Sequence, residues 1–256
     1  MANLLVIYYS AFGHVFQMAQ AVADGASQFG THDVRIVRIP EMIAQQNRVI
    51  QQDKERPQAE DEKLASAKVL SHQFRLTDRY SKYEAAQTLQ QAIPFATNDD
   101  LRWADGILWG FPTYYGTMPS QVKLFLEMAG ELCIEGALEG KPTGIFNSTA
   151  SIHTGHEAAI LTSMVPLFHF GMIFVGLPYS ENPEYLTADA IGCSPYGAST
   201  LAGPDSSLSP DPRELLMAAR LGERVADVAA ALQLFQAHKQ DRNECNFESL
   251  RSTTHL

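Results

Sequence analysis

Short apolar runs alternate with amphipathic stretches along most of the 256-residue chain. Runs rich in β-branched and aromatic residues predict buried strands, whereas apolar residues that recur every three or four positions predict helices. The apolar runs lie at residues 4–9, 34–39, 106–111, 143–146 and 172–177. Because strands that alternate with helices pair in parallel through right-handed crossovers, we expect an α/β fold: a doubly wound five-stranded parallel sheet with helices on both faces.

The last predicted helix has the clearest start. Asp211 stands at the N-cap position, Pro212 follows in the first turn, and Glu214 completes a capping box. The apolar periodicity ends at about Gln236, where we expect the helix to end. The polar residues 237–256 are expected to form a disordered tail, so that residues 1–236 make a single domain.

Residues 44–92 interrupt the alternation after the second predicted strand. They are rich in Gln, Lys, Glu and Ala, contain one Pro and no Gly, and include two polar amphipathic stretches at 60–74 and 81–93. We therefore expect a helical insertion on the outside of the sheet. Composition does not decide whether it is a solvated excursion, a lid or a subunit-contact arm.

Charge and cysteine content narrow the class of protein. The formal net charge of −10 argues against a nucleic-acid partner, because phosphates would be repelled. The first residues lack the pattern of a signal peptide, and no apolar stretch is long enough for a membrane helix, so no membrane insertion is expected. The three cysteines are widely spaced and odd in number, which favours a reducing compartment. We expect a cytoplasmic protein.

Three loops with unusual composition follow the first, third and fourth predicted strands, at the sheet edge where doubly wound proteins bind ligands. The first loop, residues 10–14, has neither the glycine pattern of a dinucleotide site nor a Walker lysine. It places small residues at a helix N-terminus, where free N–H groups and the helix dipole favour an anion such as a monophosphate. An ordinary helix-capping turn is the alternative.

The other two loops suggest a flat ring. Residues 112–116 include the adjacent aromatics Tyr114 and Tyr115, which could wall a conjugated ring system or pack against their own domain. Residues 147–155 are crowded with small hydroxyl side chains, suited to polar ring edges or to a solvent-facing connector. A phosphate end, an aromatic wall and a polar edge together describe a site for flavin mononucleotide (FMN) better than any alternative that we considered.

Four motifs resemble the WrbA-type NAD(P)H:quinone oxidoreductases in order and spacing. They are Tyr8-Tyr9-Ser10-Ala11-Phe12-Gly13-His14, Gly110-Phe111-Pro112-Thr113-Tyr114-Tyr115-Gly116, Ser148-Thr149-Ala150-Ser151 and Pro195-Tyr196-Gly197-Ala198-Ser199-Thr200-Leu201-Ala202-Gly203. The similarity covers roughly residues 1–42 and 94–236. It implies a flavodoxin-like fold, one FMN per subunit and a homo-oligomer, usually a tetramer. It also implies a two-step hydride relay in which NADH or NADPH is the donor and a quinone the acceptor.

The resemblance also implies which residues hold the cofactor. The loop that holds the phosphate would consist of Ser10, Ala11, Phe12, Gly13, His14 and Val15. The wall of the ring would consist of Pro112, Thr113, Tyr114, Tyr115 and Gly116. The ring edge and the ribityl chain would be contacted by Ser148, Thr149, Ala150, Ser151, Ile152 and His153, and His169 would approach the FMN from the helix before the fifth strand. The cofactor carries the redox chemistry, so we nominate no catalytic acid or base. His153 and His156 lack further ligands at suitable spacing, so no metal site is expected.

Three residues depart from the family pattern on the substrate side. Phe12 stands where the family commonly has Tyr, Tyr114 where it has Arg, and Cys133 where it has a substrate-contacting Trp. The positions that the resemblance assigns to FMN binding are kept. The altered residues motivate one alternative, an FMN-dependent reductase of nitro or azo aromatics. A non-enzymatic flavodoxin-like electron carrier and a non-catalytic assembly module also stay open.

Overall fold

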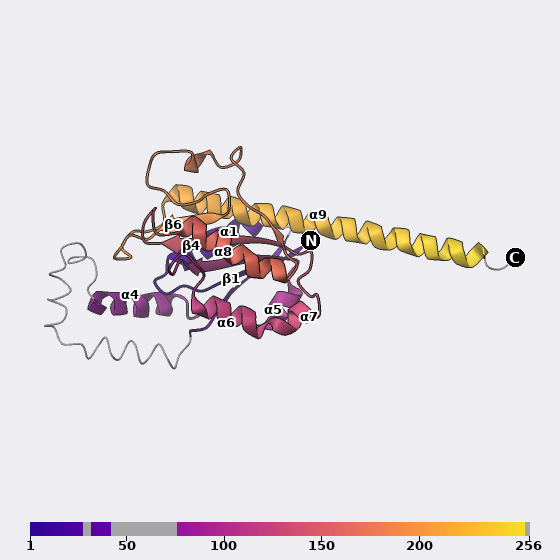
Figure 1. Cartoon of the computed structure of the whole chain (residues 1–256), viewed down its shortest axis with the longest axis horizontal. Helices are drawn as coiled ribbons and strands as arrows, with labels where there is room; N and C mark the ends of the chain where they lie inside the picture. Colours follow the sequence, from indigo (N-terminus) through magenta and orange to yellow (C-terminus); the bar gives the residue numbers. More distant parts are fainter. Residues whose placement is uncertain (28–31, 42–75, 254–256) are drawn as a thin grey trace.

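A parallel sheet forms the centre of the protein in this computed structural model, which describes residues 1–27, 32–41 and 76–253 (Figure 1). Its main path runs β2 (Asp33–Arg38), β1 (Asn3–Tyr8), β3 (Gly106–Pro112), β4 (Pro142–Thr149) and β5 (Ile173–Phe174), and every pairing along it is parallel. The order 2-1-3-4-5 is that of flavodoxin-like sheets, in which the crossover direction reverses between β1 and β3. The predicted fold class is confirmed.

The edge beyond β4 holds two short strands in place of one long strand. β5 pairs with Pro142 and Thr143 at the start of β4, and β6 (Ala198–Leu201) pairs in parallel with the end of β4, from Phe146 to Thr149. Since β3 occupies the other side of β4, the two short strands lie along the same edge. The sheet therefore has six strands, and the fifth strand predicted over 172–177 is shortened to two residues, with β6 appearing inside the predicted loop.

Helices cover both faces of the sheet, because the apolar side chains of β1 point alternately to one face and to the other. Its even-numbered residues, such as Leu4 and Val6, pack in one core with α1 (His14–Ser27) and α9 (Pro212–Thr253). Its odd-numbered residues, such as Leu5 and Ile7, pack in a second core with residues of α5 (Asn98–Trp103), α6 (Ser120–Met128), α7 (Gly130–Ile134) and α8 (His156–His169). A strand that is buried on both faces reads as a continuous apolar run, as β1 does.

Two glycines bring α1 and α9 into backbone contact. A Cβ atom added at Gly25 would overlap the carbonyl oxygen of Ala219, and one added at Gly222 would overlap the carbonyl oxygen of Val22. The two glycines therefore lie on opposite sides of one helix crossing, each facing the other helix's backbone. This close approach lets α9, from the C-terminal part of the chain, pack beside α1 over the sheet.

The last helix differs from its prediction at one end only. The predicted cap is confirmed: the carboxylate of Asp211 accepts the N–H of Arg213 at 2.8 Å, and that of Glu214 accepts the N–H of Asp211 at 2.9 Å. The predicted end at about Gln236 is wrong, because α9 continues to Thr253 and projects from the domain (Figure 1). Residues 237–253 contain neither Gly nor Pro, so no helix-breaking residue stops the helix where its apolar periodicity ends.

The predicted insertion is described only in its second part. The first amphipathic stretch, 60–74, lies outside the described residues. The second forms α4 (Leu76–Leu89), which begins somewhat earlier than the stretch 81–93 from which it was predicted. Ala86 and Gln90 are almost completely buried, so this part of the insertion is packed against the domain and is not a solvated excursion.

Candidate functional site

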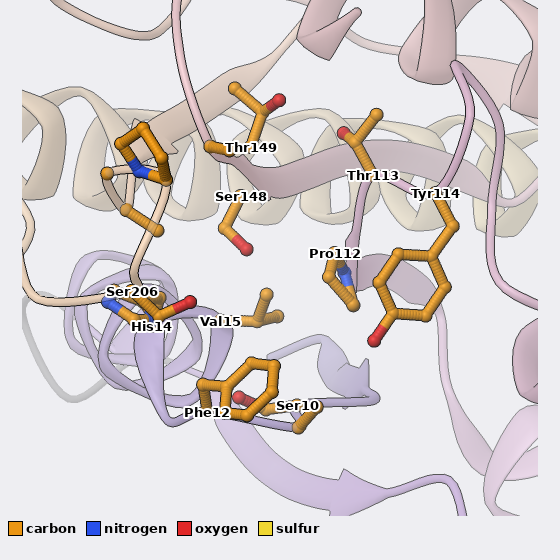
Figure 2. Close-up of a pocket in the computed structure, with 15 residues that line it drawn as sticks. Ser10, Phe12, His14, Val15, Pro112, Thr113, Tyr114, Ser148, Thr149 and Ser206 are labelled. Carbon is orange, nitrogen blue, oxygen red and sulfur yellow. The ribbon is translucent and has the colours of Figure 1, made fainter. Parts of the chain in front are cut away.

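Four loops meet around one cavity at the carboxyl ends of β1, β3, β4 and β6 (Figure 2). The empty space between them, including its solvent-open part, measures about 630 Å³. The lining residues are Ser10, Ala11, Phe12, His14, Val15, Pro112, Thr113, Tyr114, Ser148, Thr149, Ala150, Ala202, Gly203, Pro204 and Ser206. The three loops predicted from the sequence are thus brought together, and a fourth joins them.

The loop between β1 and α1 has the geometry of an anion site. The Oγ atom of Ser10 accepts the N–H groups of Gly13 at 3.2 Å and of Phe16 at 3.3 Å. Gly13 has a φ of +90°, a conformation that glycine adopts without strain, and α1 begins at the next residue. The first N–H groups of a helix have no partner within the helix, and together with its dipole they attract a negative group.

His14 lines the cavity but uses one ring nitrogen elsewhere. Its Nε2 lies 2.9 Å from the carbonyl oxygen of Leu208, an acceptor, so Nε2 carries the proton and donates. Burial lowers the pKa of His14 below its ordinary value, with a smaller lowering from the charge of Lys82, which keeps the ring neutral near pH 7. The side chain therefore ties the start of α1 to the chain that follows β6.

The two aromatic residues after β3 lie in different environments. Tyr114 lines the cavity, where Figure 2 shows it across from Phe12. Tyr115 is fully exposed, with a φ of +53°, in a tight turn closed by two backbone hydrogen bonds between Tyr114 and Thr117. Gly116 completes this turn with a φ of +77°, and neither residue lines the cavity. The aromatic wall thus consists of Phe12 and Tyr114.

Hydroxyl groups occupy the side of the cavity formed by β3 and β4. The Oγ1 atom of Thr113 is buried and has no hydrogen-bond partner within the described structure, so a polar atom of a ligand would satisfy it. Ser148 and Thr149 line the same side, and the Thr149 hydroxyl is paired at 2.6 Å with that of Thr154. The predicted contacts Ser151, Ile152 and His153 lie in the turn beyond, outside the lining.

Two of the predicted residues lie far from the cavity within this chain. The Sγ atom of Cys133 donates at 3.3 Å to the carbonyl oxygen of His169, so the two residues are neighbours. His169 is the last residue of α8, whose first residue, His156, accepts a hydrogen bond from Asn147 near the end of β4. A helix of 14 residues spans about 20 Å, which places His169 and Cys133 toward the opposite end of the sheet.

The sequence did not predict that the fourth loop, after β6, lines the cavity. Ala202, Gly203, Pro204 and Ser206 line the cavity directly after β6. The motif that ends at Gly203 was recognised in the sequence, but without β6 there was no strand end from which to infer a ligand loop. A short polar strand, Ala-Ser-Thr-Leu, gives little hydrophobic signal.

The cavity fits FMN on observations of this chain alone. One end offers free helix N–H groups and the Ser10 hydroxyl for a phosphate, and the other offers aromatic side chains and the unpaired Thr113 hydroxyl for a polar ring. The described residues that line the cavity include no Asp, Glu, Lys or Arg. Within the described part of the chain, no three His, Cys, Asp or Glu side chains are grouped to hold a metal ion, and no helix has the length and apolar character to cross a membrane.

Fold and cavity define a flavodoxin-like protein. The structure of a WrbA-like flavodoxin from Agrobacterium tumefaciens superposes with a TM-score of 0.55 at 19% identity, over 90% of this chain and 99% of that chain. The sequence model of the NADPH-dependent FMN reductase family matches residues 4–183. The chain belongs to this family.

Two curated relatives align over nearly their whole length. The NAD(P)H dehydrogenase (quinone) of Aromatoleum aromaticum is 37% identical over 230 residues, which cover 89% of this chain and 95% of the relative. NAD(P)H dehydrogenase (quinone) 3 of Rhizobium meliloti is 39% identical over 242 residues, covering 94% and 98%. The resemblance to the quinone oxidoreductases is confirmed.

The burial of two histidines predicts a loss of stability in mild acid. Burial lowers the pKa of both His14 and His156 below the ordinary 6.5. The hydrogen bond to Leu208 opposes this for His14 and Lys82 adds to it, whereas Glu157 and Glu214 oppose it for His156. The unfolded chain then binds more protons than the folded one as pH falls through 6.5 toward the lowered pKa values. The free energy of unfolding should therefore fall over this window, by about 1.4 kcal/mol for each unit of pKa shift.

Urea denaturation of the apoprotein at pH 7.5, 6.5 and 5.5 measures this slope. The double substitution His14→Gln, His156→Gln should flatten it. His153→Gln, in an exposed loop, is the matched control and should keep it. An unchanged slope in the double variant would contradict the assignment to these two side chains.

Proposed function

We propose that the protein is an FMN-dependent oxidoreductase that uses NADH or NADPH to reduce a quinone. The observation that carries this proposal is the cavity at the carboxyl edge that joins an anion-binding helix start to an aromatic and hydroxyl-lined recess. Membership of the family and the names of the relatives support it. The chemistry supplied by bound FMN is hydride transfer from the nucleotide to the quinone in two separate half-reactions.

The chain's own residues would bind the FMN and orient its ring system toward the nicotinamide and the quinone. The segment from Ser10 to Val15 would hold the phosphate with backbone N–H groups and the Ser10 hydroxyl. Thr113 would donate its buried hydroxyl to a polar atom of the ring system, with Ser148 and Thr149 beside it. Phe12 and Tyr114 would wall the space that the nicotinamide and the quinone enter in turn. With no formally charged side chain among the described lining residues, this space suits a neutral, flat acceptor.

Anaerobic stopped-flow absorbance of the FMN-loaded protein tests the proposal. NADH or NADPH should bleach the flavin band, and benzoquinone added in a second mix should restore it fully. Bleaching by neither nucleotide, with FMN bound, would contradict the nucleotide-dependent reaction and favour an electron carrier served by a protein donor. Failure of the protein to bind FMN would overturn the whole proposal.

We further propose a homo-oligomer. Exposed apolar side chains lie along the helices that cover the second core: Met128 on α6, Ile134 on α7, and Val165 and Phe168 on α8. Burial of these side chains in a subunit contact would remove them from water. The part implied for His169 and Cys133 would then require a second subunit, since neither reaches the cavity of its own chain. Light scattering coupled to gel filtration tests the oligomer.

The cytoplasmic location is part of the same proposal. Cys133 and Cys193 are free thiols, which suits a reducing compartment. Cell fractionation with an antibody against the protein tests it.

A further inference from the structure

Helix α4 of the insertion contacts two of the four loops that form the cavity. The Nζ atom of Lys82 donates at 2.6 Å to the carbonyl oxygen of Asp205, in the loop after β6. The Nε2 atoms of Gln87 and Gln90 donate at 3.1 and 3.3 Å to the carbonyl oxygen of Ser10, in the loop after β1. Helix α4 and Gln90, the residue directly after it, thereby link the two loops that flank the start of α1.

The contact with Ser10 is buried and specific. Gln90 is 1% exposed and Ala86 4% exposed, although α4 as a whole is polar. The Gln90 amide also donates at 2.8 Å to the carbonyl oxygen of Ala86. Burying an amide is costly unless its hydrogen bonds are made, and here both bonds end on backbone oxygens. Ala86 lies against Gly13, where a larger side chain would separate the helix from the loop.

These bonds also fix the orientation of a backbone donor. The peptide bond between Ser10 and Ala11 is planar and trans, as are all peptide bonds of the described chain. In a trans peptide the C=O and N–H groups point in opposite directions. Because the Ser10 carbonyl faces α4, the Ala11 N–H faces away from α4, and Ala11 lines the cavity. Accepting two hydrogen bonds also polarises this peptide and strengthens its N–H as a donor.

Lys82 adds a positive charge behind the same end of the cavity. Its ammonium group holds the carbonyl of Asp205, whose neighbours Pro204 and Ser206 both line the cavity. Its charge also acts on the ring of His14, another lining residue. The charge of Lys82 also acts on the Asp205 carboxylate, which offsets part of it. Because the described lining residues carry no formal positive charge, removal of the ammonium should lower the potential that a phosphate meets.

We propose that α4, with Gln90 directly after it, is a built part of the FMN site, in which Lys82, Gln87 and Gln90 are positioning residues that fix two loops at the phosphate end and Lys82 adds a positive charge there. This inference rests on the proposed function. It assigns to part of the insertion a role in holding the cofactor's phosphate, toward which Gln87 and Gln90 act through the Ser10–Ala11 peptide.

The first test compares FMN with riboflavin, which has the same ring but no phosphate. Flavin fluorescence titrations of the full chain give the Kd of each ligand for wild type, Lys82→Gln and the matched control Lys123→Gln. Lys123 is an exposed residue of α6, paired with Glu127. Lys82→Gln should weaken FMN about fivefold, leave riboflavin unchanged and lower the salt dependence of FMN binding, whereas Lys123→Gln should do none of these.

The second test removes the bonds to Ser10. Gln87→Ala and the double variant Gln87→Ala, Gln90→Ala should weaken FMN progressively, by about tenfold in the double variant, with a smaller effect on riboflavin. Circular dichroism and urea denaturation check that each variant folds; Gln87→Ala, which leaves the buried Gln90 in place, serves if the double variant does not.

The outcomes separate the two proposals. Wild-type protein that fails to bind FMN would overturn the proposed function. Wild-type protein that binds FMN while folded Lys82→Gln and Gln87→Ala bind it equally well would overturn only the inference about α4. Equal weakening of FMN and riboflavin would also overturn it, because the effect would then not concern the phosphate.

Discussion

Replacing Gly222 with alanine should lower the free energy of unfolding by about 3 kcal/mol, a large fraction of the stability of a domain of this size. The added Cβ would overlap the carbonyl oxygen of Val22, a backbone atom that cannot rotate away. Helix α9 must then move from α1, which loosens the packing of Leu221 and Val225 in the first core. This cost outweighs the gain of up to about 1 kcal/mol in helix propensity that alanine normally brings.

Urea denaturation followed by circular dichroism measures this loss. Gly130→Ala is the matched control: it lies in α7, has no atom within 4 Å of the added Cβ, and should be neutral or slightly stabilising. Gly25→Ala should act like Gly222→Ala, because it faces Ala219 across the same crossing. The double variant should lose less than the sum, since one displacement of α9 relieves both overlaps. A stability of Gly222→Ala equal to that of wild type would contradict the described crossing.

Strands buried on both faces were predictable because a continuous apolar run leaves few alternatives. β1, β3 and the start of β4 are such runs, and their parallel pairing followed from the alternation with helices. β6 was not predictable in this way, since its Ser199 and Thr200 are buried through hydrogen bonds. The Thr200 hydroxyl donates at 2.6 Å to Glu214, a residue that the sequence identified only as part of a helix cap. The far end of α9 was missed because periodicity reports packing, and a helix can continue beyond its packed part.

The sequence predicted those parts of the candidate site in which a loop of unusual composition directly follows a predicted strand. Small residues at the start of α1 and hydroxyl residues after β4 both follow predicted strand ends, and the cavity joins them. Tyr115 was assigned to the aromatic wall by composition alone, but positive φ values at Tyr115 and Gly116 turn its side chain outward. The contacts of Gln87 and Gln90 with Ser10 join residues more than 70 positions apart in the sequence, and no local sequence pattern predicts them.

Replacing Ser10 with aspartate should weaken FMN binding about 100-fold or more. The carboxylate would lie where the helix start and the Ser10 hydroxyl now favour an anion, and two negative groups about 4 Å apart repel by several kcal/mol at the effective dielectric constant of a protein surface. The fold should tolerate the change, because aspartate accepts the N–H groups of Gly13 and Phe16 as serine does.

Fluorescence titration with FMN and with riboflavin measures the effect and locates it. Ser10→Asp should bind riboflavin nearly as wild type does, since the repulsion acts on the phosphate. Ser120→Asp places the same charge in the first turn of α6, outside the cavity lining, and should bind FMN normally. Equal losses for FMN and riboflavin in Ser10→Asp would mean that the loop supports the ring and not the phosphate. Unchanged FMN binding would mean that the phosphate lies elsewhere, because a full negative charge at the start of α1 cannot leave an adjacent dianion unaffected.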